Sequence, residues 1–166
     1  MFILDKNSID FFRSFNFKNL KSFNTHDGIA YSCELYHNRF KIADIMNHGD
    51  GGMTSIDYTE GGEEYFDNLN VKKYHDKDLG FDNVDNEYTI SDLVETAISI
   101  KKALSKQSKS IIYIVGESIY TITFKYKFSD ILKANRADVI QNQIDKVKKE
   151  GGTILNTNLN KLGFNV

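Results

Sequence analysis

Residues 29–58 read IAYSCELYHNRFKIADIMNHGDGGMTSIDY, and this stretch decides the fold. Within residues 29–36, larger apolar side chains recur at every second position, which is the period of a half-buried strand. His37 and Asn38 then supply a turn, because Asn tolerates positive φ. Residues 40–46 resume the extended pattern, so the stretch predicts two strands joined by a hairpin.

The same pattern extends outward in both directions from this hairpin. The glycine-rich residues 47–52 interrupt it, and residues 53–58 form the next expected strand. On the other side, Phe15 and Phe17 indicate an earlier strand that ends at the turn of residues 25–28. The sequence therefore predicts an antiparallel meander of four strands.

Helices are expected after the meander. Residues 63–73 predict a short helix, and residues 72–87 are polar and acidic, which is typical of an exposed loop. Thr89 or Ser91 can cap the next helix, where acidic residues suit the positive N-terminal end. An apolar stripe identifies its buried side: Leu93, Val94, Ala97, Ile98 and Leu104.

The last third predicts a β-hairpin followed by a helix. Residues 111–115 and 119–128 alternate as strands on either side of Gly116 and Glu117. Ser129 can cap a helix that runs to Glu150 with a break near Asn135, and Gly151 and Gly152 end it. Residues 153–155 predict a short closing strand. The expected fold is α+β, a single domain over residues 1–166: an antiparallel β-meander sheet packed with two to three helices, plus a C-terminal β-hairpin.

Composition favours a soluble protein of the host-cell cytoplasm. Cys33 is the one cysteine, which excludes an internal disulfide, and its place in the alternating run indicates a buried small hydrophobe. The N-terminus lacks the basic start and apolar core of a signal peptide. No apolar run reaches the roughly 18 residues that a membrane helix needs, so no membrane partner is expected, and no motif calls for a cofactor or a metal.

Charge is distributed unevenly along the chain, although the formal net charge is only −2. Residues 46–100 hold 3 basic and 13 acidic side chains, whereas residues 101–166 hold 12 and 5. The acidic run is interpreted either as a solvated segment compensated by the basic third or as a surface for a basic protein partner. The residues that would form this surface are Asp76, Asp78, Asp82, Asp85 and Glu87.

Two loops carry His, Asp and Gly and are candidate ligand-binding loops. One contains His26 and Asp27, and the other contains His48, Asp50, Gly51 and Gly52. Two strands separate them, so a meander would place both at one end of the sheet, where imidazoles and carboxylates could bind a nucleotide or metal or transfer a proton. The alternative is that the glycines only provide positive φ for turns. His37 and His75 have no partner spacing, which predicts solvated side chains.

Aromatic residues alternate with lysines in residues 119–128, a pattern that either buries one face of a strand or stacks single-stranded nucleic acid. The basic residues that would serve the second interpretation are Lys125, Lys127, Lys133, Arg136, Lys146, Lys148 and Lys149.

Two stretches carry a resemblance: DGIAYSCELYHNRFKIADIMNHGDGGM (residues 27–53) and TITFKYKFSDILKANRADVIQNQIDKVKKEGGTILN (residues 121–156). The chain resembles, in its first and last thirds, small uncharacterised accessory proteins of bacteriophages and prophages. The resemblance implies a protein of a mobile element that binds and blocks a host defence component.

The sequence is consistent with three functions. The leading hypothesis is a non-enzymatic binding protein, an inhibitor of the anti-CRISPR or another anti-defence type, that acts on a basic, nucleic-acid-binding host protein through its acidic surface. The first alternative is a small nucleotide- or metal-binding protein, or a hydrolase, that uses the His/Asp/Gly loops. The second is a nucleic-acid-binding module that uses the basic C-terminal third.

Overall fold

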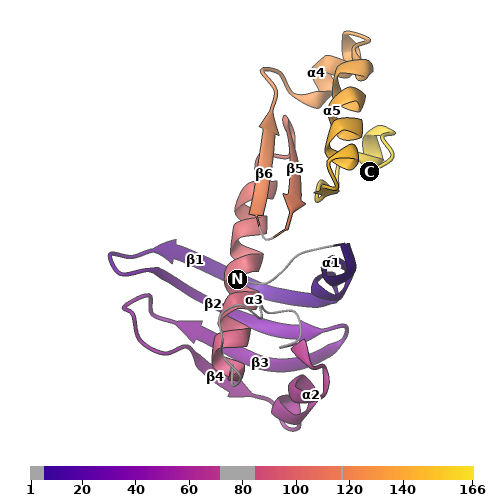
Figure 1. The fold of residues 1–166 in the computed structure, drawn as a ribbon. Helices are drawn as coiled ribbons and strands as arrows, with labels where there is room; N and C mark the ends of the chain where they lie inside the picture. The colour runs from indigo at the N-terminus through magenta and orange to yellow at the C-terminus, as the bar shows by residue number, and fades with distance from the viewer. Residues whose placement is uncertain (1–5, 72–84, 117) are drawn as a thin grey trace. The chain divides into compact units, whose positions relative to one another are not determined.

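The computed structural model describes residues 6–71, 85–116 and 118–166 of the chain (Figure 1). The contacts group the chain mainly into an N-terminal unit, Asn7–Ile98, and a C-terminal unit, Ser99–Val166. Each unit contains one antiparallel sheet with helices, which confirms the α+β class and the meander. The single domain expected over residues 1–166 stays a prediction.

The N-terminal unit is built on four antiparallel strands in the order β1-β2-β3-β4. Their bounds are β1 Phe15–Asn24, β2 Ile29–His37, β3 Phe40–Asn47 and β4 Ser55–Tyr58. Asn38 adopts the positive φ expected of the turn between β2 and β3. All four predicted strands are thus present and in the predicted order.

The register of the meander explains why apolar residues alternate with polar ones along its strands. Cys33 pairs with Ile45, and Leu35 pairs with Ala43, so apolar side chains from neighbouring strands share one face of the sheet. The register shifts just beyond this pair, and Ile42 and Ala43 are both fully buried although they are adjacent. A bulge of this kind turns two consecutive residues toward the core.

Among the described residues, three α-helices contribute to the N-terminal unit: α1 Lys6–Arg13, α2 Gly62–Asn68 and the first part of α3 Asn86–Leu104. Helix α1 was not expected from the sequence. Helix α3 starts before both predicted capping residues, so that prediction is wrong. The cap is Asp85, whose Oδ1 accepts a hydrogen bond from the Tyr88 backbone N–H at 2.8 Å.

The C-terminal unit places β5 Ser110–Val115 at the centre of a sheet with the order β6-β5-β7. Its other elements are β6 Ser118–Thr123, α4 Phe128–Lys133, α5 Ala137–Lys149, β7 Thr153–Ile154 and a 3₁₀ turn at Asn160–Leu162. The core comprises Ile111, Phe128, Ile140, Ile144, Val147, Ile154, Leu159 and Phe164. The predicted hairpin and closing strand are both present, and they lie in one sheet.

Strand β6 ends at Thr123, so the predicted strand to Phe128 is too long. The chain turns because the Phe128 N–H bonds the Ser108 carbonyl at 2.8 Å, and the Phe128 ring is buried in the core as α4 begins. The predicted Ser129 cap is also wrong, since Lys127 holds the N-cap position without a side-chain bond.

The predicted break and end of the last helix are confirmed. Asn135 has a φ of 56° and separates α4 from α5. After α5, the Gly152 N–H bonds the Val147 carbonyl at 2.9 Å and the Gly151 N–H bonds the Lys148 carbonyl at 3.1 Å. Gly151, with a φ of 77°, completes the left-handed cap that these two bonds define.

Candidate binding surfaces

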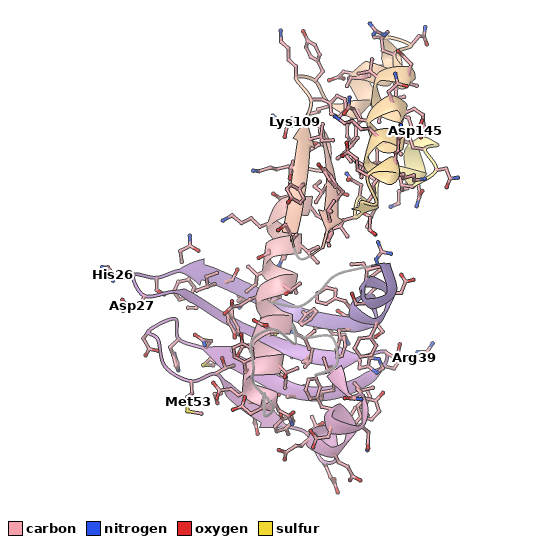
Figure 2. All side chains as sticks on the ribbon, in the orientation of Figure 1. His26, Asp27, Arg39, Met53, Lys109 and Asp145 are labelled. Carbon is pink, nitrogen blue, oxygen red and sulfur yellow. The ribbon has the colours of Figure 1, made fainter. Side chains whose placement is uncertain are left out.

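The two His/Asp/Gly loops lie side by side at one end of the meander, as predicted. The Thr25 hydroxyl donates a hydrogen bond to the Gly49 carbonyl, which joins the β1–β2 turn to the loop after β3. Figure 2 shows His26 and Asp27 at the tip of the first loop and Met53 in the second, whereas Arg39 lies at the opposite end of the sheet.

The second loop is folded as two successive side-chain turns. Asn47 Oδ1 accepts from the Gly49 N–H at 2.7 Å, and Asp50 Oδ1 accepts from the Gly52 N–H at 3.0 Å. Gly49 and Gly51 have φ of 68° and 78°, so the turn interpretation of these glycines is supported. Asp50 has a structural role in its own loop.

The loop histidines remain at the surface. His26 Nδ1 lies 2.9 Å from Asp27 Oδ1, with the His26 side chain 97% exposed, and His48 is exposed as well. Among the described stretches, no three His, Cys, Asp or Glu side chains gather in a way that could hold a metal ion. The loops therefore share an end of the sheet without bringing their four titratable residues into one cluster.

A buried hydrogen-bond network centred on Thr54 fastens the second loop to α3. The Thr54 hydroxyl lies 3.1 Å from the Tyr31 hydroxyl and 2.7 Å from the Ser91 hydroxyl, and it accepts from Asn47 Nδ2 at 2.9 Å. The Thr54 N–H donates to Glu87 Oε1 at 2.6 Å. Each of these polar groups has a hydrogen-bond partner, so the network holds the second loop against α3 and has a structural role.

Burial disfavours ionisation of two side chains of this unit, Tyr31 and Cys33. Burial raises the pKa of the Tyr31 hydroxyl. Burial, with smaller contributions from Asp44 and Glu34, raises the pKa of the Cys33 thiol to about 12. Cys33 is buried and free, which confirms its predicted place in the core.

His37 is buried, so the prediction of a solvated side chain is wrong. Its Nδ1 lies 2.9 Å from the Tyr65 hydroxyl of α2, and its ring lies 5.0 Å from the Phe15 ring. Burial lowers the pKa of the imidazole. The sequence did not reveal this contact because Tyr65 lies 28 residues away, on a different element.

Carboxylates dominate the surface of the N-terminal unit. The described residues 42–71 and 85–100 carry eleven Asp and Glu side chains and no Lys or Arg. Three of these carboxylates act on Tyr58: burial raises the pKa of its hydroxyl, the Asn86 side chain lowers it, and the charges of Glu63, Asp67 and Asp85 raise it further. Asn86 Nδ2 donates to Asp67 Oδ1 at 2.8 Å, which ties α2 to the start of α3. We call Glu63, Asp67 and Asp85 the acidic cluster.

The acidic surface continues along α3. The charge of Asp92, then partial burial and the charge of Glu95, raise the pKa of the exposed Tyr88. Desolvation and the charge of Asp92 raise the pKa of Glu95. Carboxylates therefore continue along α3 from Asp85 to Glu95.

The five residues predicted for the acidic surface have different outcomes. Asp76, Asp78 and Asp82 lie outside the described residues. Asp85 is exposed and caps α3, and Glu87 accepts from the backbone of Thr54. The sequence analysis did not assign Glu63 and Asp67 to the acidic surface. Their place within residues 42–71, which contain no lysine or arginine, was a signal that could have identified them.

In the C-terminal unit, the aromatic alternation does not form one buried face. Ile122 and Phe124 pack against the core, whereas Tyr120 is 46% and Tyr126 is 58% exposed. The interpretation of these two tyrosines as core is wrong. Tyr126 lies beyond the end of β6 at Thr123, and Tyr120 lies within β6, where it stacks on Tyr113 and stays partly exposed.

Neither a family model, nor a curated protein, nor a solved structure matches this chain. Among the described residues, no helix combines the length and the apolar character that crossing a membrane requires.

Proposed function

We propose that the protein is a non-enzymatic binding protein that captures a basic protein partner through the acidic surface of its N-terminal unit. The observation that carries the proposal is the acidic cluster near Tyr58, whose members lie in two described stretches, 42–71 and 85–100, that contain no lysine or arginine. Such a surface attracts a basic partner at long range and speeds association at low salt.

The arrangement also gives the surface a fixed shape. Glu63 and Asp67 lie on α2, Asp85 caps α3, and the bond from Asn86 to Asp67 joins the two helices. Carboxylates held on helices lose less conformational entropy on binding than carboxylates on a free chain. Tyr88, exposed beside Asp92 and Glu95, adds an aromatic side chain of a kind enriched at interfaces.

The partner class that we propose follows from the resemblance to phage accessory proteins. Components of host defence that hold nucleic acid carry basic grooves, and an acidic surface can occupy such a groove in place of a phosphate backbone. The chain would then act as an anti-defence inhibitor in the host cytoplasm, by occupation of the groove and without chemistry.

The test compares charge removal at the acidic cluster with charge removal elsewhere. Glu63→Gln removes one carboxylate of the acidic cluster, and Glu64→Gln, made with it, removes the neighbouring carboxylate of α2. Both side chains are exposed and make no side-chain bond in the described structure. The control, Asp138→Asn with Glu150→Gln, removes two exposed charges from the C-terminal unit, one of which, Asp138, is paired with Arg136 at 3.4 Å. Tagged parent and variants would be used to capture partners from lysate of the host, with quantitative mass spectrometry of the bound proteins.

We expect one basic protein to be captured by the parent and by the control, and at least tenfold less of it by the α2 variant. Capture should weaken when salt rises from about 50 to about 300 mM, because exposed charges are then screened. Equal capture by the two variants, or capture that is indifferent to salt, would reject the acidic cluster as the binding surface.

A further inference from the structure

The C-terminal unit contains an apolar groove that the acidic surface does not use. It has a volume of about 600 Å³ and opens to solvent. Its lining comes from the segment after β6, from α4 and from the start of α5: Phe124, Lys125, Tyr126, Asp130, Ile131, Ala134, Arg136 and Val139. A groove of this volume suits one nucleotide-sized group, since small-ligand sites measure about 300–1,000 Å³.

The walls of the groove are set by the packed core of the unit. Phe124 contacts the buried Phe128 ring edge to face, with the ring centroids 5.4 Å apart. On the other side, the backbone N–H of Arg136 donates a hydrogen bond to the Ile131 carbonyl at 3.1 Å. Asn135, which has a positive φ, forms the turn between α4 and α5. The groove is therefore defined before any ligand binds.

One exposed aromatic ring and two cations line this groove, in addition to the half-buried Phe124. Tyr126 is 58% exposed, and Lys125 Nζ lies 5.4 Å from the centre of its ring. Arg136 lines the groove as the second cation and is also exposed. An exposed ring beside two cations matches the base and the flanking phosphates of a single strand.

Charge complementarity selects an anionic occupant. Residues 99–166 hold 12 basic and 5 acidic side chains, a net charge of +7, and the exposed Lys127 and Lys133 adjoin the lining residues in sequence. Arg136 is already paired with Asp138, whose Oδ1 lies 3.4 Å from Arg136 Nε, so an apolar peptide would leave Lys125 as the lining cation without a counter-charge. Asp130, the carboxylate in the lining, supplies an acceptor for the exocyclic amino group of a base.

We infer that this groove binds single-stranded nucleic acid, with one amino-bearing base against Tyr126 and the neighbouring phosphates on Lys125 and Arg136. The base is unpaired, because a base inside a duplex cannot enter a groove or stack on a side chain. This site is independent of the acidic surface and of the partner proposed for it.

Fluorescence anisotropy with a labelled single strand of adenine and cytosine, about 12 nucleotides long, tests the inference on the full chain. The parent should bind the strand at low salt and bind the matching duplex at least tenfold more weakly. Tyr126→Ala should weaken binding of the strand about tenfold or more. The control is Tyr120→Ala, which removes a second exposed tyrosine of the same unit outside the groove and should change binding less than twofold.

A second pair of variants separates the groove from the general charge of the unit. Lys125→Glu and Lys149→Glu change the net charge equally, and only Lys125 lines the groove. We expect Lys125→Glu to weaken binding several-fold more than Lys149→Glu. Circular dichroism should show that all four variants keep the parent fold, since each replaced side chain is partly or fully exposed.

Four results would overturn the inference. They are absence of binding at low salt, equal binding of the duplex, equal losses in the two tyrosine variants, and equal losses in the two lysine variants. Binding of an apolar helical peptide in the groove, without binding of the single strand, would assign the groove to a peptide and would overturn it as well.

Discussion

The two units of this chain have opposite charge. Residues 7–98 carry 17 acidic and 8 basic side chains, whereas residues 99–166 carry 5 acidic and 12 basic ones. The formal net charge of −2 therefore conceals units of −9 and +7. Potential at a surface depends on the charges nearby, so each unit can attract a different class of partner while the whole chain is almost neutral.

The two sheets also differ in how their strands are buried. Along β2, the buried Tyr31, Cys33 and Leu35 alternate with half-buried polar or amphipathic residues. Along β5, the consecutive Ile111 and Ile112 are both fully buried, and so is Ile114. A strand that is buried on both faces reads as a continuous apolar run, and one buried on a single face reads as an alternation. Both sheets could be predicted, the meander from its alternation and the C-terminal hairpin from its apolar run and the alternation that follows it.

The largest expected change in stability comes from substitutions in the two cores. These substitutions test whether the two units are stabilised separately. Leu35→Ala removes a fully buried side chain from the N-terminal unit, and Ile144→Ala does the same in the C-terminal unit. Each should lower the free energy of unfolding of its own unit by about 2–5 kcal/mol. Hydrogen exchange followed by mass spectrometry would locate the loss. Equal acceleration of exchange over both units in either variant would instead support the single domain expected from the sequence.

The next effect concerns the loop after β3. A Cβ at Gly49, where φ is 68°, would lie 2.6 Å from the Ala30 nitrogen, whereas a Cβ at Gly51, with a φ of 78°, would meet nothing within 4 Å. Gly51→Ala should cost about 1 kcal/mol from backbone strain, and Gly49→Ala should cost about 2–4 kcal/mol because strain and a backbone clash add. Urea denaturation of both variants measures the difference. Equal costs would show that the two loops are not in contact.

A smaller change in stability is expected at Asp85. Two substitutions there separate its role as the cap of α3 from its role as a negative charge on the surface. Asp85→Ala removes the cap of α3 and should destabilise the N-terminal unit by about 1 kcal/mol. Asp85→Asn keeps an oxygen acceptor for the Tyr88 N–H, so it should retain stability within a few tenths of a kcal/mol while it weakens partner capture. Thermal unfolding of the two variants, with the capture assay, distinguishes the roles. Equal destabilisation by Ala and Asn would show that charge, and not the cap, stabilises the helix.

The smallest effect is a dependence of stability on pH. Burial lowers the pKa of His37. The folded state therefore binds this proton more weakly than the unfolded chain, whose histidine pKa is about 6.5. Stability is fully present above about pH 6.5 and is lost as the pH falls through the lowered folded value. Chemical denaturation at several pH values should show this slope in the parent and a flatter profile in His37→Gln. An unchanged slope in the variant would assign the effect to another group.

Much of the fold could be predicted because the signals were local. The alternation in residues 29–36, the turn at Asn38 and the glycine pair at 151 and 152 each depend on neighbours in sequence. The errors arose where distant contacts decide. Strand β6 stops at Thr123 because Phe128 turns into the core, and α3 begins at its cap, Asp85, inside a stretch that reads as a polar loop.

The binding surfaces were harder to predict than the fold. The sequence placed the acidic character correctly in the middle of the chain, but it could not show that Glu63 and Asp67 gather with Asp85 around Tyr58. It also suggested aromatic stacking near Lys125 without indicating the groove, which requires α4 and α5 to meet at Asn135. Spatial clusters of this kind depend on tertiary packing, which periodicity does not encode.

The account centres on two oppositely charged units with separate partners, and chemical-shift mapping tests it most directly. ¹H–¹⁵N spectra of the labelled protein would be recorded during titration with a short polylysine peptide and, separately, with the single-stranded oligonucleotide. The account predicts that the peptide shifts signals of residues 57–67 and 85–95, and that the oligonucleotide shifts signals of residues 124–139. Shifts of the same residues with both probes, or oligonucleotide shifts confined to the N-terminal unit, would contradict it.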